Sequence, residues 1–266
     1  MKTFVGKSAL VTGVSRGIGT FIARTLAKAG AEIIGIARST NDLKKLKKEI
    51  LALGGKIKII SFDLNKIEEL SELVANLNLN HQIDILVNNA GIEKYKHYSD
   101  NSLQSIESII NVNLLAPMEI TRLLLPRMLK RESGNIVNIA SLAGKKGVAY
   151  NSIYSASKAG MIKWSDGLRQ ELHKTGVSVS TIMPGYINKA GMFFDGGQKA
   201  PMLLGTSSPQ NVADAVMKAI KTGKGEIIVN KGFIKPLLSL NIFSPELGDF
   251  IVRKFGIINL SKKRIN

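Results

Sequence analysis

The segment TGVSRGIG, residues 12–19, decides how the rest of the chain is interpreted. It follows the apolar run SALVT at 8–12 and opens a helical pattern. Backbone amides at such a strand-to-helix turn can hold a pyrophosphate at the helix N-terminus. We assign Gly13 to the tight turn, Gly17 to close approach of a ligand, and Gly19 to close contact between helix and sheet. A glycine cluster after a strand also occurs in purely structural turns, so the rest of the chain must decide.

Short β-branched runs alternate with helical patterns along the whole chain, which is the rhythm of βαβ units. The runs are apolar throughout, as in parallel sheets that are covered on both faces. The sequence therefore predicts an α/β fold with one Rossmann-like, doubly wound parallel sheet of about seven strands and helices on both faces. We expect strands near 8–12, 32–36, 57–61, 84–88, 134–140, 177–183 and 226–229, and helices near 17–29, 40–52, 66–78, 102–130, 152–174 and 209–221.

The composition excludes several classes of protein. The chain has 266 residues, a formal charge of +17 and no cysteine, so disulfides and thiol chemistry are absent. Three separated histidines show no ligand spacing, and we expect no metal site. The basic residues are not interleaved with aromatic ones, so we expect no nucleic-acid partner. No signal peptide is recognisable and no apolar run approaches the ~20 residues of a membrane span, so we expect a cytoplasmic protein.

Further motifs fall at the ends of predicted strands, where open parallel sheets bind ligands. Asp63-Leu64 ends the third strand, NNAG at 88–91 ends the fourth, and Ser141 ends the fifth. Tyr154 and Lys158 are four residues apart on a helix, which places both side chains on one face. Because a nearby ammonium favours the phenolate, we expect Lys158 to lower the pKa of Tyr154 from about 10 toward the neutral range.

In this order and spacing the motifs resemble those of the classical short-chain dehydrogenase/reductase family, over roughly residues 4–230. The resemblance implies an NAD(P)-dependent oxidoreductase that transfers hydride between nicotinamide and a carbonyl or secondary alcohol. It implies that Tyr154 carries the proton, that Lys158 also holds the nicotinamide ribose, and that Ser141 binds the substrate oxygen. Asn113 matches the family's proton-relay asparagine, and its neighbour Asn111 is the alternative assignment.

The resemblance also assigns the cofactor contacts, and a family turn at Pro184-Gly185 lies beside the nicotinamide. The family often has threonine where this chain has Lys189, which is a departure. The implied contacts are Gly13, Ser15, Arg16, Gly17, Ile18, Gly19, Arg38, Asp63, Leu64, Asn89, Gly91, Tyr154, Lys158 and Ile187.

Cofactor choice depends on the end of the second strand. NAD-selective members carry an acid there, but this chain has Ala37. Arg38 and Arg16 can instead pair with a 2′-phosphate, for which a guanidinium is well suited. We therefore expect NADP(H), with NAD as the alternative.

Our expectations about the substrate come from the last third of the chain. Residues 184–206 hold five glycines and two prolines and predict a loop over the substrate. We divide the chain into a cofactor-binding and catalytic domain, 1–230, and an extension, 231–266, that packs on or covers the substrate site. The apolar residues of the loop favour a hydrophobic, acyl, lipid or steroid-like substrate. They are Ala190, Met192, Phe193, Phe194, Met202, Leu203 and Leu204.

Within 245–260, five apolar residues recur at spacings of three and four and predict one helix with an apolar stripe. They are Leu247, Phe250, Ile251, Phe255 and Ile258. We expect this apolar stripe either to pack on the protein's own substrate lobe or on a neighbouring subunit, or to form a lid over a hydrophobic substrate. Such a lid, with Lys254 and the basic run 262–264, would contact an anionic membrane weakly and peripherally.

Two expectations remain at the level of the whole protein. The family resemblance implies a homodimer or homotetramer. The alternative to an enzyme is a catalytically silent, cofactor-binding regulatory protein, against which the intact Ser141, Tyr154 and Lys158 argue.

Overall fold

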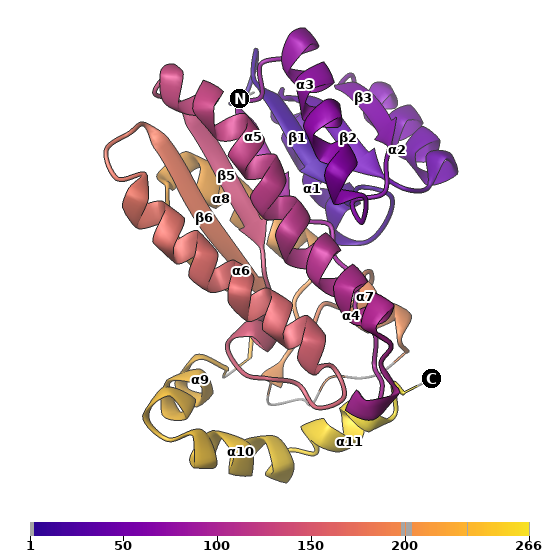
Figure 1. The fold of residues 1–266 in the computed structure, drawn as a ribbon, viewed down its shortest axis with the longest axis vertical. Helices are drawn as coiled ribbons and strands as arrows, with labels where there is room; N and C mark the ends of the chain where they lie inside the picture. Colours follow the sequence, from indigo (N-terminus) through magenta and orange to yellow (C-terminus); the bar gives the residue numbers. More distant parts are fainter. Residues whose placement is uncertain (1–2, 198–199, 201–203, 233, 266) are drawn as a thin grey trace.

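The sheet is built from seven parallel strands. The computed structural model describes residues 3–197, 200, 204–232 and 234–265 (Figure 1). The strand order is β3-β2-β1-β4-β5-β6-β7, so the order reverses between β1 and β4. This confirms the predicted doubly wound α/β sheet. The strands are β1 (Ser8–Thr12), β2 (Glu32–Ala37), β3 (Lys56–Ser61), β4 (Ile85–Asn88), β5 (Gly134–Ile139), β6 (Val177–Pro184) and β7 (Glu226–Val229).

Helices cover both faces of the sheet, because the strands are apolar on both sides. One core contains side chains of α1 (Ile18–Lys28), α2 (Thr40–Ala52) and α8 (Pro209–Thr222). A second core lies on the opposite face, beneath α3 (Leu70–Asn80) and α5 (Ala116–Lys130). Helix α6 (Ser152–Glu171) runs beside α4 (Leu103–Ile110) on that same face (Figure 1).

The long helix expected over 102–130 is instead three consecutive helical segments. A π-helical turn, Asn111–Leu115, separates α4 from α5. Among the described residues, only Leu103–Lys130 is long and apolar enough to cross a membrane, which the sequence-based expectation did not anticipate. Its Ile109, Ile120 and Leu124 are buried against the sheet, as in the core helix of a globular domain.

The extension forms three helices rather than one stripe-bearing helix. They are α9 (Ile234–Phe243), α10 (Pro245–Lys254) and α11 (Ile257–Lys262), and they lie beyond the carboxyl ends of the strands (Figure 1). The prediction of one continuous helix over 245–260 was wrong. Gly256 adopts a φ of 66°, so α10 ends before it and α11 begins after it. A left-handed glycine commonly stops a helix in this way.

Candidate active site

A cavity of about 370 Å³ opens at the carboxyl edge of the sheet. Its walls come from the loop after β1, the loop after β4, helix α6, the loop after β6 and the extension. These segments are far apart in sequence and meet because parallel strands end at the same edge. The topological switch between β1 and β4 lies at this edge, which is where open α/β sheets bind ligands.

The glycine loop can pack closely against itself and against the loop after β4 because its glycines have no side chain. Gly13 has a φ of 72°, and a Cβ there would stand 2.7 Å from the Cα of Ala90. A Cβ at Gly19 would stand 2.1 Å from the Gly13 carbonyl oxygen. Asn89 fixes the turn, because its Nδ2 donates to the carbonyl oxygens of Thr12 and Gly13 at 2.9 and 3.1 Å. The loop therefore fits the pyrophosphate of a dinucleotide at the start of α1.

All fourteen residues that the sequence assigned to the cofactor line this one cavity. Arg16 and Arg38 are exposed at its edge, and Arg16 forms an ion pair with Asp195 at 3.0 Å. Ile187 is buried beneath the cavity floor and bridges to Ser207. Lys189, the position that departs from the family, is exposed and does not line the cavity.

Tyr154 and Lys158 lie on one face of α6, with Ser141 opposite them at the end of β5. Tyr154 is 7% exposed and Lys158 is 2% exposed. Lys158 donates from Nζ to the Ile139 carbonyl oxygen at 2.8 Å, and this Nζ is 5.8 Å from the Tyr154 ring centre. The structure thus brings the three predicted side chains to the same wall of the cavity.

The electrostatics of this pair differ from the sequence-based expectation. Burial raises the pKa of Tyr154, and the carboxylate of Glu93 raises it further, while Ser141 opposes the rise. Burial also lowers the pKa of Lys158 to about 8. The expected lowering of the Tyr154 pKa by Lys158 was therefore wrong, because the loss of water around the buried phenol outweighs the neighbours that lower the pKa, Ser141 and Arg264. Tyr154 is a neutral phenol here, which is the form that donates a proton.

Asn113 lies in the π-helical turn and is fully buried. Its Oδ1 accepts from the Ile92 amide at 2.8 Å, and its Nδ2 donates to the Ile92 carbonyl and to Ser157. Asn111 instead bonds to Asn65 at the surface, away from the cavity. Asn113 does not itself line the cavity, but it is bonded to Ile92, which does, whereas Asn111 has its contact at the surface.

Comparisons with known proteins show the family of this chain. The sequence model of the family described as short chain dehydrogenase matches residues 7–198. The chain belongs to the short-chain dehydrogenase family. A protein of Nostoc named "Ketoacyl reductase HetN" is 49% identical over 99% of this chain and 94% of its own length. The predicted enzyme class, an oxidoreductase acting on CH–OH or C=O groups, is thereby confirmed as well.

Solved structures of other short-chain dehydrogenases share the fold. A metagenomic short-chain oxidoreductase in complex with NADP is 32% identical, with a TM-score of 0.74 over 85% of this chain and 97% of its own. An actinorhodin polyketide ketoreductase with NADPH is 29% identical, with a TM-score of 0.76 over 84% of this chain and 95% of its own.

The substrate side of this short-chain dehydrogenase has an apolar wall. Met192 and Phe193 of the short helix α7 (Met192–Asp195) line the cavity, and Leu204 is buried against it. Phe194 instead points outward and is 52% exposed. The extension contributes Ile234, Leu237, Leu238, Ile251, Val252, Ile257 and Leu260 to the same wall. Ala190 does not line the cavity, and Met202 and Leu203 lie outside the described residues.

The sequence analysis missed a group of polar residues at this wall. Glu93 and Tyr95 follow the NNAG motif, Asn151 precedes α6, and Arg264 follows α11. All four line the cavity, and hydrogen bonds join Asn151 to Glu93 and join Arg264 to both Glu93 and Tyr95. The sequence holds one indication that Glu93 lies near the cavity, which is its position two residues after Gly91 of the NNAG motif. Nothing in the sequence pairs it with a residue 171 positions later.

Proposed function

We propose that this chain is an NADP(H)-dependent reductase of hydrophobic carbonyl substrates of the ketoacyl type. We further propose that residues 231–266 form a separate extension that covers its substrate site. The observation that carries the proposal is one cavity in which the glycine loop, the catalytic tyrosine and an apolar wall meet. The names of the Nostoc relative and of the polyketide ketoreductase support the substrate class.

The cofactor proposal rests on the charge at the adenosine end of the cavity. Arg16 and Arg38 are exposed there, and the last residue of β2 is Ala37 rather than an acid. A 2′-phosphate would gain charge-assisted hydrogen bonds from these guanidinium groups. NAD is the alternative, and relatives crystallised with NADP or NADPH favour the phosphorylated form.

In the proposed reaction, the bound cofactor supplies hydride to the carbonyl carbon of the substrate. Tyr154 donates its phenolic proton to the carbonyl oxygen, and burial keeps that proton in place until the substrate arrives. Ser141 holds the same oxygen in position. Lys158 would bind the nicotinamide ribose, and Asn113 fixes the loop that carries Ile92 beside the site.

The substrate class follows from the wall of the extension. Ile251 and Val252 of α10 and Leu260 of α11 face the cavity. Burying apolar chain against such a wall contributes roughly 0.8 kcal/mol for each methylene group. We therefore expect catalytic efficiency to rise with the length of the acyl chain until the lumen is full.

A kinetic test uses 3-oxoacyl thioesters of graded length with NADPH and with NADH. We expect kcat/KM to be at least ~10-fold higher with NADPH and to rise with chain length. The variant Val252→Asn, which places a polar group in the lumen, should reduce that dependence on length, whereas Arg253→Gln on the exposed side should not. A preference for NADH, or efficiency independent of chain length, would contradict the proposal.

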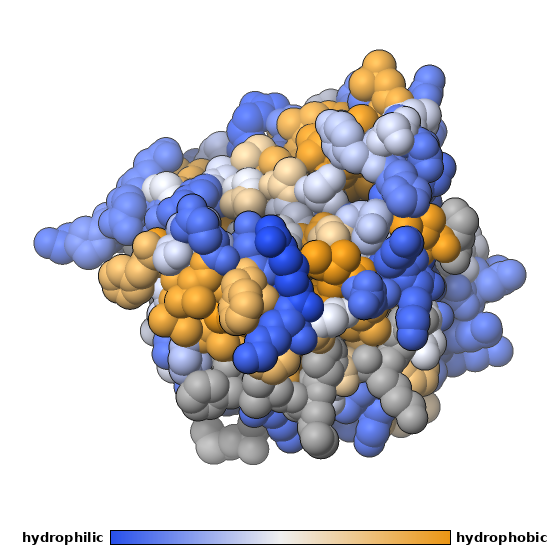
Figure 2. All heavy atoms as spheres, turned by 90° about the horizontal axis from the view of Figure 1, so that it is seen from below, coloured by the Kyte–Doolittle hydropathy of each residue, from blue (hydrophilic) through white to orange (hydrophobic). Residues whose placement is uncertain are grey.

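A peripheral membrane contact is proposed for the outer surface of the same extension. Ile242, Phe243 and Phe250 are 77%, 87% and 56% exposed, and Nζ of Lys254 lies 5.6 Å from the centre of the Phe250 ring. Figure 2 shows hydrophobic and hydrophilic side chains side by side on this face of the molecule. The extension carries seven basic and two acidic residues. Such a surface suits an anionic bilayer, from which a hydrophobic substrate could enter the cavity.

Co-sedimentation with vesicles of phosphatidylserine and phosphatidylcholine tests the contact. Phe243→Ser should weaken binding, and Leu79→Ser should not, because Leu79 is 80% exposed near the end of α3, which lies far from the extension (Figure 1). We expect binding to weaken as salt is raised. Equal binding by both variants would contradict the proposed membrane contact.

We also propose that the protein is a homodimer or a homotetramer, and light scattering of the same proteins tests this.

A further inference from the structure

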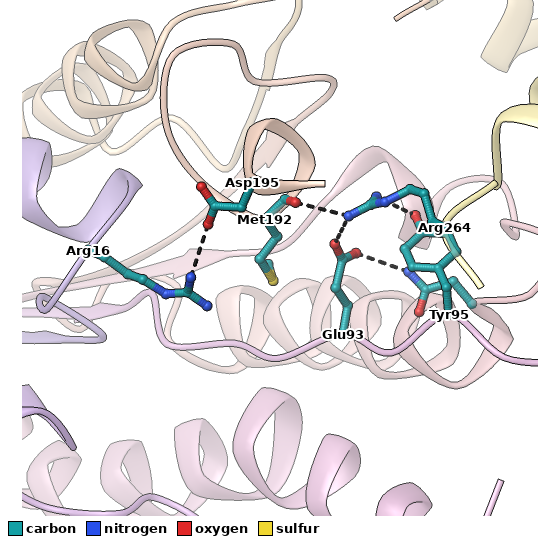
Figure 3. A network of polar contacts seen from close by, with 7 residues as sticks. Arg16, Glu93, Tyr95, Met192, Asp195 and Arg264 are labelled. Carbon is teal, nitrogen blue, oxygen red and sulfur yellow. Dashed lines mark hydrogen bonds and ion pairs between the residues drawn. The ribbon is translucent and has the colours of Figure 1, made fainter. Parts of the chain in front are cut away.

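Arg264 joins the end of the extension to the wall of the active site. Its side chain is 10% exposed, and Nη2 donates to Glu93 Oε1 at 2.7 Å and to the Met192 carbonyl oxygen at 2.9 Å (Figure 3). Nη1 donates to the Tyr95 hydroxyl at 2.9 Å, and the guanidinium stands 4.1 Å from the centre of the Tyr95 ring. One side chain therefore holds three segments together: the loop after β4, helix α7 and the end of the extension.

Glu93 carries the connection onward to the catalytic helix. Its second oxygen, Oε2, accepts from Nδ2 of Asn151 at 3.0 Å. Asn151 is the N-cap residue of α6, and Tyr154 lies in the first turn of that helix. The Glu93 side chain is only 12% exposed, so its carboxylate is held next to the proton donor with little water.

We propose that Glu93 and Arg264 are positioning residues for the reaction at Tyr154. Glu93 anchors the start of α6, and Arg264 closes the extension and α7 over the cavity while it balances the charge of Glu93. This inference rests on the proposed function, since it concerns the same site and the same proton transfer.

A need for packing alone does not account for this pair. Burying an ion pair gains little stability over apolar side chains of similar volume, and here the rest of the wall is apolar. Removing one partner, by contrast, leaves a charge without compensation in a site that excludes water. A carboxylate that is largely removed from water is costly, so its presence is better explained by the contact it makes with Asn151.

Glu93 and Arg264 both act on the pKa of Tyr154, so their effect can be measured as a shift in the pH dependence of the reaction. The groups that act on Tyr154 are Glu93 and Tyr95 from the loop after β4, Ser141 after β5, Lys158 from α6 and Arg264 from the extension. Tyr186, from the loop after β6, lines the same cavity. After burial, Glu93 is the largest cause that raises the pKa of Tyr154, and Arg264 lowers that pKa. Glu93 also raises the pKa of Lys158. Removing either partner should therefore shift the titration of the site, in opposite directions.

The experiment compares Glu93→Gln, Arg264→Gln, Arg264→Lys and the double variant Glu93→Gln/Arg264→Gln. Lys262→Gln is the matched control, because it removes an exposed positive charge two residues from Arg264. For alcohol oxidation, the rise of kcat with pH should move to lower pH in Glu93→Gln and to higher pH in Arg264→Gln, by roughly half a unit or more. Arg264→Gln should lower kcat/KM at least ~10-fold, and the double variant should recover part of that loss.

Arg264→Lys separates the two roles of the arginine. Lysine keeps the positive charge but cannot reproduce the planar donor geometry that reaches Glu93, Tyr95 and Met192 together. We expect its pH profile to stay near that of the parent protein while KM rises. Lys262→Gln should leave both the profile and KM unchanged.

Two readouts need no substrate. Hydrogen exchange of residues 234–265 should accelerate in both Arg264 variants and not in Lys262→Gln. Tyrosinate absorbance, corrected with Tyr154→Phe, should report the same opposite shifts in the presence of NADPH. If no carbonyl compound is reduced but these two readouts behave as stated, the proposed function fails and the positioning role stands. Shifts in the same direction, additive losses in the double variant, or unchanged exchange overturn the positioning role.

Discussion

Replacement of Lys158 by methionine should abolish catalysis and yet stabilise the cofactor-free protein. Burial lowers the pKa of Lys158 from 10.5 to about 8, and at roughly 1.4 kcal/mol for each pH unit the charged form costs about 3 kcal/mol of folding free energy. Methionine removes this cost, but the Ile139 carbonyl loses its donor, which offsets about 1–2 kcal/mol. A net gain of roughly 1–2 kcal/mol corresponds to a rise in Tm of about 2–8 °C for a chain of this size.

The pH dependence follows from the direction of the shift. The folded-state pKa of Lys158 lies below the unfolded value of 10.5, so the destabilisation is complete below about pH 8 and fades as the pH rises toward 10.5. The difference in Tm between Lys158→Met and the parent should thus be large near neutral pH and shrink in alkaline buffer. Calorimetry of the cofactor-free proteins across this range measures it, with Lys163→Met as the control because Lys163 is exposed on the same helix.

Two results would refute this reasoning. A variant that melts below the parent near neutral pH would mean that the hydrogen bond to Ile139 outweighs the desolvation of the ammonium. A Tm difference that does not narrow in alkaline buffer would mean that the ammonium is not the source of the instability.

The remaining predictions concern the chemistry and the cofactor. Tyr154→Phe should lower turnover by at least ~10²-fold while NADPH binding, followed by fluorescence, stays nearly intact; retained activity would exclude Tyr154 as the proton donor. Gly19→Ala should abolish NADPH binding, because its Cβ would stand 2.1 Å from the Gly13 carbonyl oxygen; tight NADPH binding by this variant would show that the loop can rearrange. Asp195→Asn should tighten NADPH binding by up to ~5-fold, because it frees Arg16 from an exposed ion pair that is worth at most about 1 kcal/mol. That gain should be smaller for NADH and should fade at high salt, and an equal gain for both cofactors would place Arg16 away from the 2′-phosphate.

The sheet and most of the cofactor cavity were predictable from the sequence because local patterns carry them. Each strand is a short apolar run, and the motif residues stand at the ends of those runs. Parallel topology then brings Gly13, Asn89, Ser141 and Tyr154 to one edge without any information about long-range contacts.

The rest of the site depends on contacts that no local pattern encodes. The π-helical turn that carries Asn113 looks like ordinary helix in the sequence, since the extra residue per turn has no composition of its own. Two of the stripe residues, Leu247 and Phe250, lie on the outside of α10 while Ile251 faces the cavity, which their spacing alone does not indicate. Glu93 and Arg264 become partners only through the folded extension, and the raised pKa of Tyr154 arises from burial that sequence spacing does not report.

The three-helix extension also gives the proposed substrate lining and the reaction centre different places in the chain, with Arg264 as the residue that joins them. Every residue assigned to proton transfer or to the dinucleotide precedes residue 188, whereas much of the apolar lining comes from residues after 233. Substitutions in α9–α11 can therefore remodel the lumen while the reaction centre keeps its geometry. Over evolutionary time, such a division lets a lineage acquire new substrates by drift in one short terminal segment, with selection on the older sheet left undisturbed.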